Sequence, residues 1–307
     1  MRVAVVGAGA IGGWVAARLA LSGNEVMALA SRGPLDTLEV IEAGETHAAQ
    51  FSRFGEAADL VVIAVKAPAL PEIADTLKPL VGAGTIIVPM LNGVPWWFLE
   101  GEPVQSIDPG GSIAAALPFD QIVGCVVHAS CSRPAPGRVV VKHADKLIIG
   151  EPGGENSERL ARLHALLERA GLKPDPTGNV RRAIWYKLWG NATINPLSAL
   201  TRATCDLILA DPECRAWMLE GMSELAKVGA AIGCPITESG EDRMAVTARL
   251  GAFKTSTLQD VEAGRPIELE ALLGAPREIA RRHGIATPAL DRLYRVTKLM
   301  AEGLGLG

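Results

Sequence analysis

Near its start the chain reads Arg2-Val-Ala-Val-Val-Gly-Ala-Gly-Ala-Ile-Gly12, a short apolar run that leads directly into three spaced glycines. The apolar run predicts a buried strand, and the Ala-rich segment from Ile11 to Leu21 predicts a helix. In the dinucleotide fingerprint, the first glycine allows a tight turn and the second lets the backbone approach a pyrophosphate. The third lets the helix lie close to the strand. With a second predicted strand from Glu25 to Ala30, the segment indicates the opening βαβ unit of a Rossmann-like domain.

The end of the second predicted strand indicates which dinucleotide binds. An NAD site normally places Asp or Glu here against the ribose hydroxyls. This chain instead has Ser31 and Arg32, and the next acidic residue is Asp36, beyond a proline. A guanidinium and a hydroxyl suit a 2′-phosphate, so NADP (NADPH) is favoured over NAD. The alternative is that Arg32 is only a surface loop cation.

Composition argues against several other classes of protein. The 307 residues carry a formal net charge of -4, which offers no basic field for nucleic acid. The uncharged run from Pro79 to Leu99 is interrupted by glycines and prolines, so it predicts a strand and a loop rather than a membrane helix. The cysteines form no CxxC pair and the histidines show no metal-ligand spacing. We therefore expect a cytoplasmic protein with reduced thiols, no metal site and no membrane partner.

The two halves of the chain differ in pattern. Apolar runs in the N-terminal half are punctuated by Gly and Pro, which is typical of α/β structure, and the stretch from Pro136 to Gly150 resembles an antiparallel hairpin. Long amphipathic helical patterns then take over. We predict an α/β fold with a Rossmann-like NADP-binding domain over residues 1–178 and an all-helical substrate and catalytic domain over residues 179–307.

Two polar residues follow predicted strands of the first half. Ligands of such sheets bind beyond the carboxyl ends of the strands, which makes Lys66 and Asn92 candidates for the cofactor or substrate site. The alternatives are that Lys66 only marks a strand end and that Asn92-Gly93 is only a turn. The predicted cofactor-binding residues are Gly7, Gly9, Ala10, Ile11, Gly12, Ser31, Arg32, Lys66 and Asn92.

The segment Trp185-Tyr-Lys-Leu-Trp-Gly-Asn-Ala-Thr-Ile-Asn-Pro196 holds the strongest candidate for a catalytic group. Lys187, Asn191 and Asn195 recur every four residues, which places one ammonium and two amides on a single stripe of a helix. Such a stripe is suited to a polar ligand, and a solvated face is the alternative. Further along, Ser256 and Glu268 stand in a second polar segment, where each residue by itself is unremarkable.

Together and in this order, these segments resemble the ketopantoate reductase family, formally 2-dehydropantoate 2-reductases, over nearly the whole chain. The resemblance rests on the glycine motif, Lys66 after its strand, Asn92-Gly93, Pro136-Gly137, the Lys187-to-Asn195-Pro-Leu motif, and Ser256 through Glu268. It implies NADPH-dependent reduction of a small 2-keto acid, most directly ketopantoate to pantoate in pantothenate biosynthesis. It further implies that Lys187 is the general acid and Glu268 a second catalytic residue, while the substrate is held by Asn92, Asn191, Asn195 and Ser256.

Physical chemistry supports these roles. Hydride that arrives at a carbonyl carbon builds negative charge on the oxygen, and the Lys187 ammonium can stabilise that charge and supply the proton. The amides of Asn191 and Asn195 can bind carboxylate and hydroxyl groups without adding a charge. Glu268 can accept from a substrate hydroxyl or orient Lys187.

The chain departs from the family pattern in two places. Trp96, Trp97 and Phe98 replace the usual polar stretch after Asn-Gly, and either line the substrate pocket or pack in a core. Ile267 and Leu273 stand where the family commonly has Thr and Asn. The competing interpretations are a related NADP-dependent reductase of a bulkier keto acid or imine, and a non-catalytic NADPH sensor. The apolar segment from Ala216 to Ile232 is compatible with a homodimer.

Overall fold

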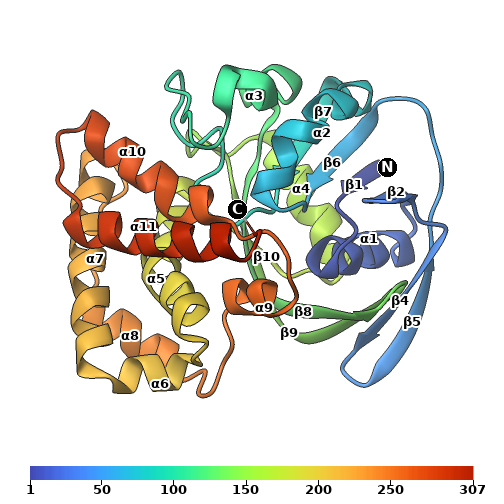
Figure 1. Ribbon diagram of the computed structural model, residues 1–307. Coiled ribbons are helices and arrows are strands. Elements are labelled where there is room, and N and C mark those ends of the chain that lie inside the picture. The colour runs from blue at the N-terminus through green and yellow to red at the C-terminus, as the bar shows by residue number, and fades with distance from the viewer. Residues whose placement is uncertain (307) are drawn as a thin grey trace. The chain divides into compact units, whose positions relative to one another are not determined.

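The computed structural model describes residues 1–306, which form two compact units (Figure 1). The first unit contains Met1–Leu91 and Gly111–Arg181, and the second contains Asn92–Gly110 and the chain from Arg182 onward. The first is mixed α/β and the second is helical. The predicted fold class is therefore confirmed.

A mostly parallel sheet forms the centre of the first unit. Its strand order is β3-β2-β1-β6-β7, and only β3 runs antiparallel to its neighbour. The glycine fingerprint joins β1 to α1, as predicted. The bounds are β1 Arg2–Val6, α1 Ala10–Leu21, β2 Glu25–Ala30, β3 Gly33–Pro34, β6 Ala58–Ile63, α2 Leu70–Leu77, β7 Val81–Pro89, α3 Ser112–Ala116 and α4 Glu158–Arg169.

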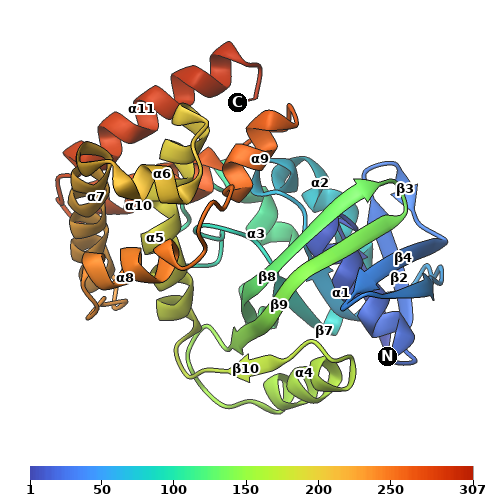
Figure 2. The same cartoon turned by 90° about the horizontal axis from the view of Figure 1, so that it is seen from below.

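A second sheet of the same unit has the order β10-β9-β4-β5, with β8 paired antiparallel to β9. Figure 2 shows β8 and β9 in green as a long, twisted pair. Gly137, with φ of 72°, lies in the turn between them. The antiparallel pairing is as predicted, but residues 138–150 form the single strand β9, and its partner β8 comes before Pro136, outside the predicted range. The hairpin of β4 and β5 was not predicted, because its strands carry many charged and polar residues. The bounds are β4 Thr37–Glu42, β5 Glu45–Gln50, β8 Gly124–Ala135, β9 Arg138–Gly150 and β10 Pro174–Pro176.

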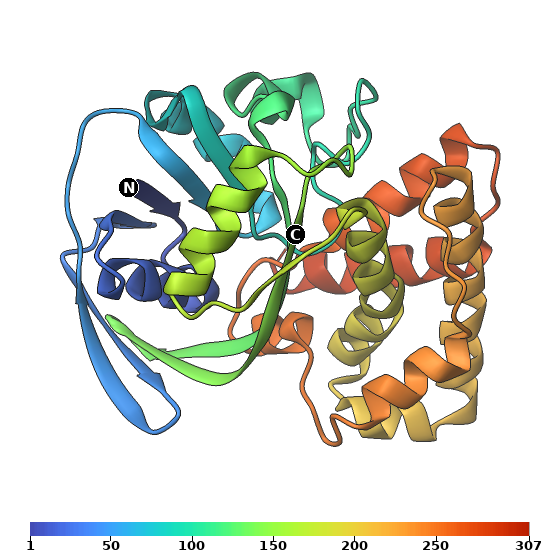
Figure 3. The same ribbon diagram turned by 180° about the vertical axis from the view of Figure 1, so that it is seen from behind.

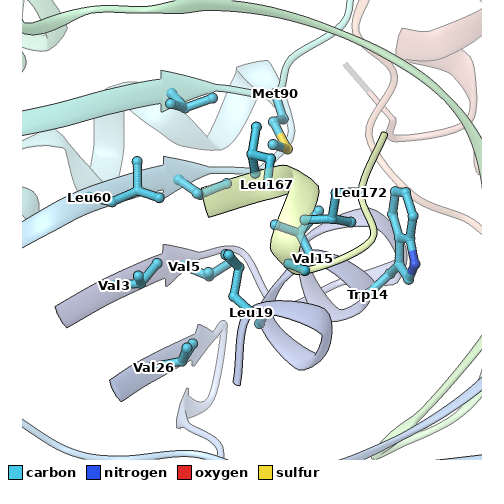
Figure 4. Packing of buried hydrophobic residues seen from close by; sticks show 14 of the residues in the cluster. Val3, Val5, Trp14, Val15, Leu19, Val26, Leu60, Met90, Leu167 and Leu172 are labelled. Atoms are coloured by element: carbon cyan, nitrogen blue, oxygen red, sulfur yellow. The ribbon is translucent and has the colours of Figure 1, made fainter. Parts of the chain in front are cut away.

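Helix α1 contacts strands of both sheets, which explains why its sequence is apolar on nearly every side. Figure 4 shows Val15 and Leu19 of this helix beside Val3, Val5 and Val26 of the first sheet. Leucines of α4 join the same cluster, and Figure 3 shows that helix in yellow-green across the strands. The core therefore fixes the β1-α1 turn on which a dinucleotide would rest.

The second unit is built around α5, which begins at Val180 and ends at Thr201. The indole N–H groups of Trp185 and Trp189 donate to the carbonyls of Leu225 and Met222 of α7, at 3.1 and 2.7 Å. Among residues 1–306, no helix is both long and apolar enough to cross a membrane. The other bounds are α6 Cys205–Ala210, α7 Pro212–Ala231, α8 Gly240–Ala248, α9 Ser256–Glu262, α10 Ala275–Arg282 and α11 Pro288–Gly303.

Residues 92–110 pack with the helical unit, although the predicted boundary near residue 179 placed them with the sheets. The Phe98 ring stacks on Trp185 of α5 at a centroid distance of 5.8 Å. Glu278 of α10 accepts hydrogen bonds from the backbone N–H and the hydroxyl of Ser106, at 2.8 and 2.7 Å. These contacts are made by side chains distant in sequence, so chain order alone could not assign the segment. The boundary between functional domains stays a prediction.

Candidate active site

The β1-α1 turn packs closely against itself and against the residues that follow β6, which only glycines allow. Gly7 has φ of 95°, and a Cβ there would lie 2.6 Å from the backbone carbon of Ala64. A Cβ on Gly12 would lie 2.2 Å from the Gly7 carbonyl oxygen. Gly9 precedes α1 without a side-chain cap, so the first-turn amides, including those of Ala10 and Ile11, are oriented for an anion.

The predicted ribose-phosphate residues lie at the end of β2. Ser31 and Arg32 follow this strand directly and both are exposed. Asp36 pairs with Arg53 at 2.8 Å, so the nearest acidic group after the strand has a cation of its own. The end of β2 thus presents an exposed hydroxyl and an exposed guanidinium, the groups that a 2′-phosphate needs as partners.

Lys66 lies just beyond the carboxyl end of β6, at the start of a short 3-10 helix over Ala67–Ala69. The residues before it, Ala64 and Val65, are those that crowd Gly7. Lys66 is therefore next to the turn that carries the glycine fingerprint, on the edge of the sheet where ligands of such folds bind.

In the second unit, Asn92 connects the two predicted catalytic residues. The Lys187 ammonium donates to Oδ1 of Asn92 at 3.0 Å, and Nδ2 of Asn92 donates to Oε2 of Glu268 at 3.2 Å. An ammonium only donates and a carboxylate only accepts, so the neighbours determine which way the amide points. Glu268 is buried, with 9% of its surface exposed, and Lys187 is half-buried. One hydrogen-bonded chain thus joins Asn92 to Lys187, 95 positions later in the sequence, and to Glu268, 176 positions later.

The polar stripe lies on α5, as predicted. Lys187, Asn191 and Asn195 occupy successive turns of this helix, with Asn191 half-buried and Asn195 6% exposed. The two tryptophans that bond to α7 fix the rotation of α5 about its axis and so the direction of the stripe. Ser256 is the exposed first residue of α9, whose N-terminus is capped by the Thr255 side chain.

The aromatic segment after Asn92-Gly93 is buried within the helical unit. Trp96, Trp97 and Phe98 are 4%, 3% and 1% exposed. The stacking of Phe98 on Trp185 makes this segment part of the support for α5. Of the two interpretations, packing in a core accounts for these contacts.

Two family models match the chain. Residues 3–154 match ketopantoate reductase PanE/ApbA, and residues 179–301 match the C-terminal model of ketopantoate reductase PanE/ApbA. A 2-dehydropantoate 2-reductase from Mesorhizobium japonicum is 36% identical over an alignment of 324 positions, which covers 99% of each chain.

The chain belongs to the ketopantoate reductase family.

Solved structures agree. A protein from Ralstonia solanacearum MolK2, solved as a candidate ketopantoate reductase, has a TM-score of 0.94 and 46% identity, covering 100% of this chain and 99% of its own. The 2-dehydropantoate 2-reductase from Geobacter metallireducens GS-15 has a TM-score of 0.84 and 28% identity, covering 98% of this chain and 100% of its own. The protein is therefore an oxidoreductase of the ketopantoate reductase family.

The two departures from the family pattern near Glu268 are apolar side chains buried in the helical unit. Ile267 and Leu273 are 4% and 0% exposed. Apolar side chains at these positions thus stabilise the turn that follows Glu268. Sequence reasoning missed the shape of this turn, a π-helix over Glu270–Gly274, because helical periodicity does not reveal a single widened turn.

Proposed function

We propose that this protein reduces ketopantoate (2-dehydropantoate) to pantoate with NADPH, in the biosynthesis of pantothenate. The observation that carries the proposal is the hydrogen-bonded chain from Lys187 through Asn92 to Glu268. Membership of the ketopantoate reductase family and the 36% identical 2-dehydropantoate 2-reductase support the choice of substrate.

When bound, NADPH supplies a hydride to the carbonyl carbon of the substrate. Lys187 stabilises the negative charge that develops on the carbonyl oxygen and gives its proton to that oxygen, so that one hydride and one proton yield the hydroxyl group. Glu268 accepts from the Asn92 amide, which turns the amide oxygen toward Lys187 and holds the ammonium in place. Asn191, Asn195 and Ser256 bind the polar groups of the keto acid.

The residues present fit NADPH. Gly7 and Gly12 let the turn pack against itself and against the residues that follow β6. A Cβ at Gly9 would meet nothing nearer than 3.9 Å, so the backbone at Gly9 is open to the close approach of a pyrophosphate. Ala10 and Ile11 supply amides of the first helical turn, and Gly9 keeps the approach open. Ser31 and Arg32 bind the 2′-phosphate, while Lys66 and Asn92 contact the ribose or nicotinamide portion.

Replacing Arg32 with alanine is expected to raise the Kd for NADPH by about 10- to 100-fold, because one charge-assisted contact to the 2′-phosphate is lost. The Kd for NADH should change by less than about twofold, since NADH lacks this phosphate. Titration of cofactor fluorescence measures both constants. Arg138→Ala is the matched control. Arg138 is an exposed arginine of β9 that pairs with Glu39 of β4, and it is not among the predicted cofactor-binding residues. Equal weakening of both cofactors by Arg32→Ala would contradict the assignment.

Substrate choice is tested by the rate of NADPH oxidation with ketopantoate and with a panel of bulkier 2-keto acids. Preferential turnover of ketopantoate supports the proposal, and turnover only of another keto acid would contradict the substrate while retaining the reaction class. Tight NADPH binding without any turnover would favour a cofactor sensor.

We further propose that the enzyme acts in the cytoplasm and as a homodimer. The free thiols of its five cysteines support the first statement. Burial raises the pKa of Cys131 to about 12 and that of Cys205 to about 11, so these thiols stay protonated and unreactive.

The apolar side of α7 packs inside the helical unit, so a homodimer would have to form through another surface.

A further inference from the structure

The turn that follows Glu268 is wider than an α-helical turn. Within the π-helix over Glu270–Gly274, the Ala275 N–H donates to the carbonyl of Glu270, five residues earlier. An α-helix would instead pair the Ala275 N–H with the carbonyl of Ala271. Single π-turns inside helices occur frequently at functional sites.

The widened turn leaves the Ala271 carbonyl without its usual helical donor. Its α-helical donor, the Ala275 N–H, is taken by Glu270, and the next residue is Pro276, which has no N–H. The Ala271 carbonyl instead accepts a hydrogen bond from the backbone N–H of Val94 at 2.9 Å. The π-turn is thereby joined to the segment that carries Asn92.

Gly93 makes this approach possible. It has φ of 79°, and a Cβ at this position would lie 2.4 Å from the carbonyl oxygen and 2.5 Å from the carbonyl carbon of Ala271. Any side chain would have to push the two backbones apart. The neighbouring residue is Asn92, whose amide makes the hydrogen bonds to Lys187 and Glu268.

The other side of the π-turn is held by side chains. The Glu270 carboxylate folds over Gly274, where a Cβ would lie 1.9 Å from its Oε2. The Tyr294 hydroxyl of α11 donates to Oε1 of Glu270 at 2.7 Å. The Arg277 guanidinium lies 4.0 Å from the centroid of the Tyr294 ring. The turn is therefore fixed from both sides.

We propose that the Ala271 carbonyl, the Val94 N–H and the contact surface of Gly93 form a backbone clamp that fixes Asn92 between Lys187 and Glu268. Gly93 and Pro276 are positioning residues for the reduction: Gly93 permits the close approach, and Pro276 keeps the Ala271 carbonyl available to Val94. This inference rests on the proposed function, because it assigns the clamp to the Lys187 site.

The first test compares Gly93→Ala with Gly101→Ala. Both glycines have positive φ and lie in the same segment, but a Cβ at Gly101 would meet nothing within 4 Å. Both variants thus carry the same kind of backbone strain, and only Gly93→Ala forces the clamp apart. We expect Gly93→Ala to lower kcat by about 100-fold, since displacement by about 1 Å is enough for such a loss. The Kd for NADPH should rise no more than it does in Asn92→Ala, because the clamp acts through Asn92, and Gly101→Ala should retain nearly full kcat.

Hydrogen exchange of the Val94 amide provides a readout that does not depend on activity. In the wild-type protein this amide should be protected, and Gly93→Ala should abolish the protection. Pro276→Ala serves as a second variant should Gly93→Ala fail to fold, because it supplies the π-turn with a competing N–H. It should speed exchange of the Val94 amide and lower kcat, and it should raise the Kd for NADPH no more than Asn92→Ala does.

A double-mutant cycle separates positioning from general destabilisation. If each clamp residue acts through Asn92, Gly93→Ala or Pro276→Ala should lower kcat by less than about twofold when added to Asn92→Ala. An equal loss in both backgrounds, or unchanged Val94 exchange in both clamp variants, would overturn the inference. A wild-type protein that turns over no 2-keto acid would contradict the proposed function, whereas the Val94 exchange still decides whether the clamp exists.

Discussion

Replacing Lys187 with alanine is expected to lower kcat for 2-keto acid reduction by about 10²- to 10⁴-fold, the range for removal of a general acid. The variant loses both the proton donor and the positive charge beside the developing oxyanion. The Kd for NADPH should stay within about twofold of the wild-type value, because the glycines of the β1-α1 turn and Arg32 belong to the other compact unit. Steady-state kinetics and a cofactor titration measure the two effects.

Lys227→Ala is the matched control for this experiment. Lys227 is exposed on α7 in the same unit, so its removal should leave kcat unchanged. Lys187→Arg keeps the positive charge but replaces the proton donor by a guanidinium, which stays protonated. The kcat of this variant should therefore stay far below that of the wild-type protein. Full turnover by Lys187→Ala with normal NADPH binding would contradict the assignment of Lys187 as the general acid.

Replacing Glu151 with alanine is expected to lower the free energy of unfolding by about 1–3 kcal/mol, the cost of leaving buried donors without their acceptor. The larger cost of an unpaired, fully buried charge does not apply, because the Arg159 side chain that remains is 26% exposed. Glu151 is 0% exposed and accepts hydrogen bonds from Nε and Nη2 of Arg159, at 2.8 and 2.6 Å, and from the Ser157 hydroxyl. Arg159 also donates to the carbonyls of Asp120 and Ile122. The pair therefore joins the start of α4, the end of β9 and the loop before β8.

Urea unfolding measures this effect as a lower midpoint at unchanged slope. Glu155→Ala is the control, because Glu155 is an exposed acid in the same connection and its removal should change stability by less than about 0.5 kcal/mol. Similar midpoints for the two variants would show that the buried pair does not stabilise the first unit.

Local sequence signals predicted the dinucleotide-binding turn and the polar stripe. The glycines of the β1-α1 turn are required by contacts within a few residues of the turn or with the adjacent strand, so their spacing carries the information. The stripe of Lys187, Asn191 and Asn195 follows from helical periodicity alone. The sequence of the aromatic segment, in contrast, fits a pocket lining and a core equally well, and only its burial in the fold distinguishes the two.

The remaining features depend on contacts that no local pattern encodes. Asn92 and Glu268 are 176 residues apart in sequence, and only the fold places their side chains 3.2 Å from each other. The segment after Asn92 joins the helical unit through Phe98 and Ser106, which bond or stack with partners far along the chain. The π-turn combines Pro276, which has no N–H, with the Val94 N–H as a distant donor to the Ala271 carbonyl. The sequence around Pro276 does not reveal that donor, so it could not predict the turn.

We propose that hydride passes from NADPH to the carbonyl carbon of ketopantoate, with Lys187 as the proton donor. Isotope labelling tests this transfer: the reaction is run with NADPH that carries deuterium at both C4 positions, and the product is analysed by mass spectrometry. The expected product is pantoate heavier by one deuterium, formed at a rate that Lys187→Ala reduces by about 10²- to 10⁴-fold. Unlabelled pantoate, or no pantoate from a protein that binds NADPH, would contradict it.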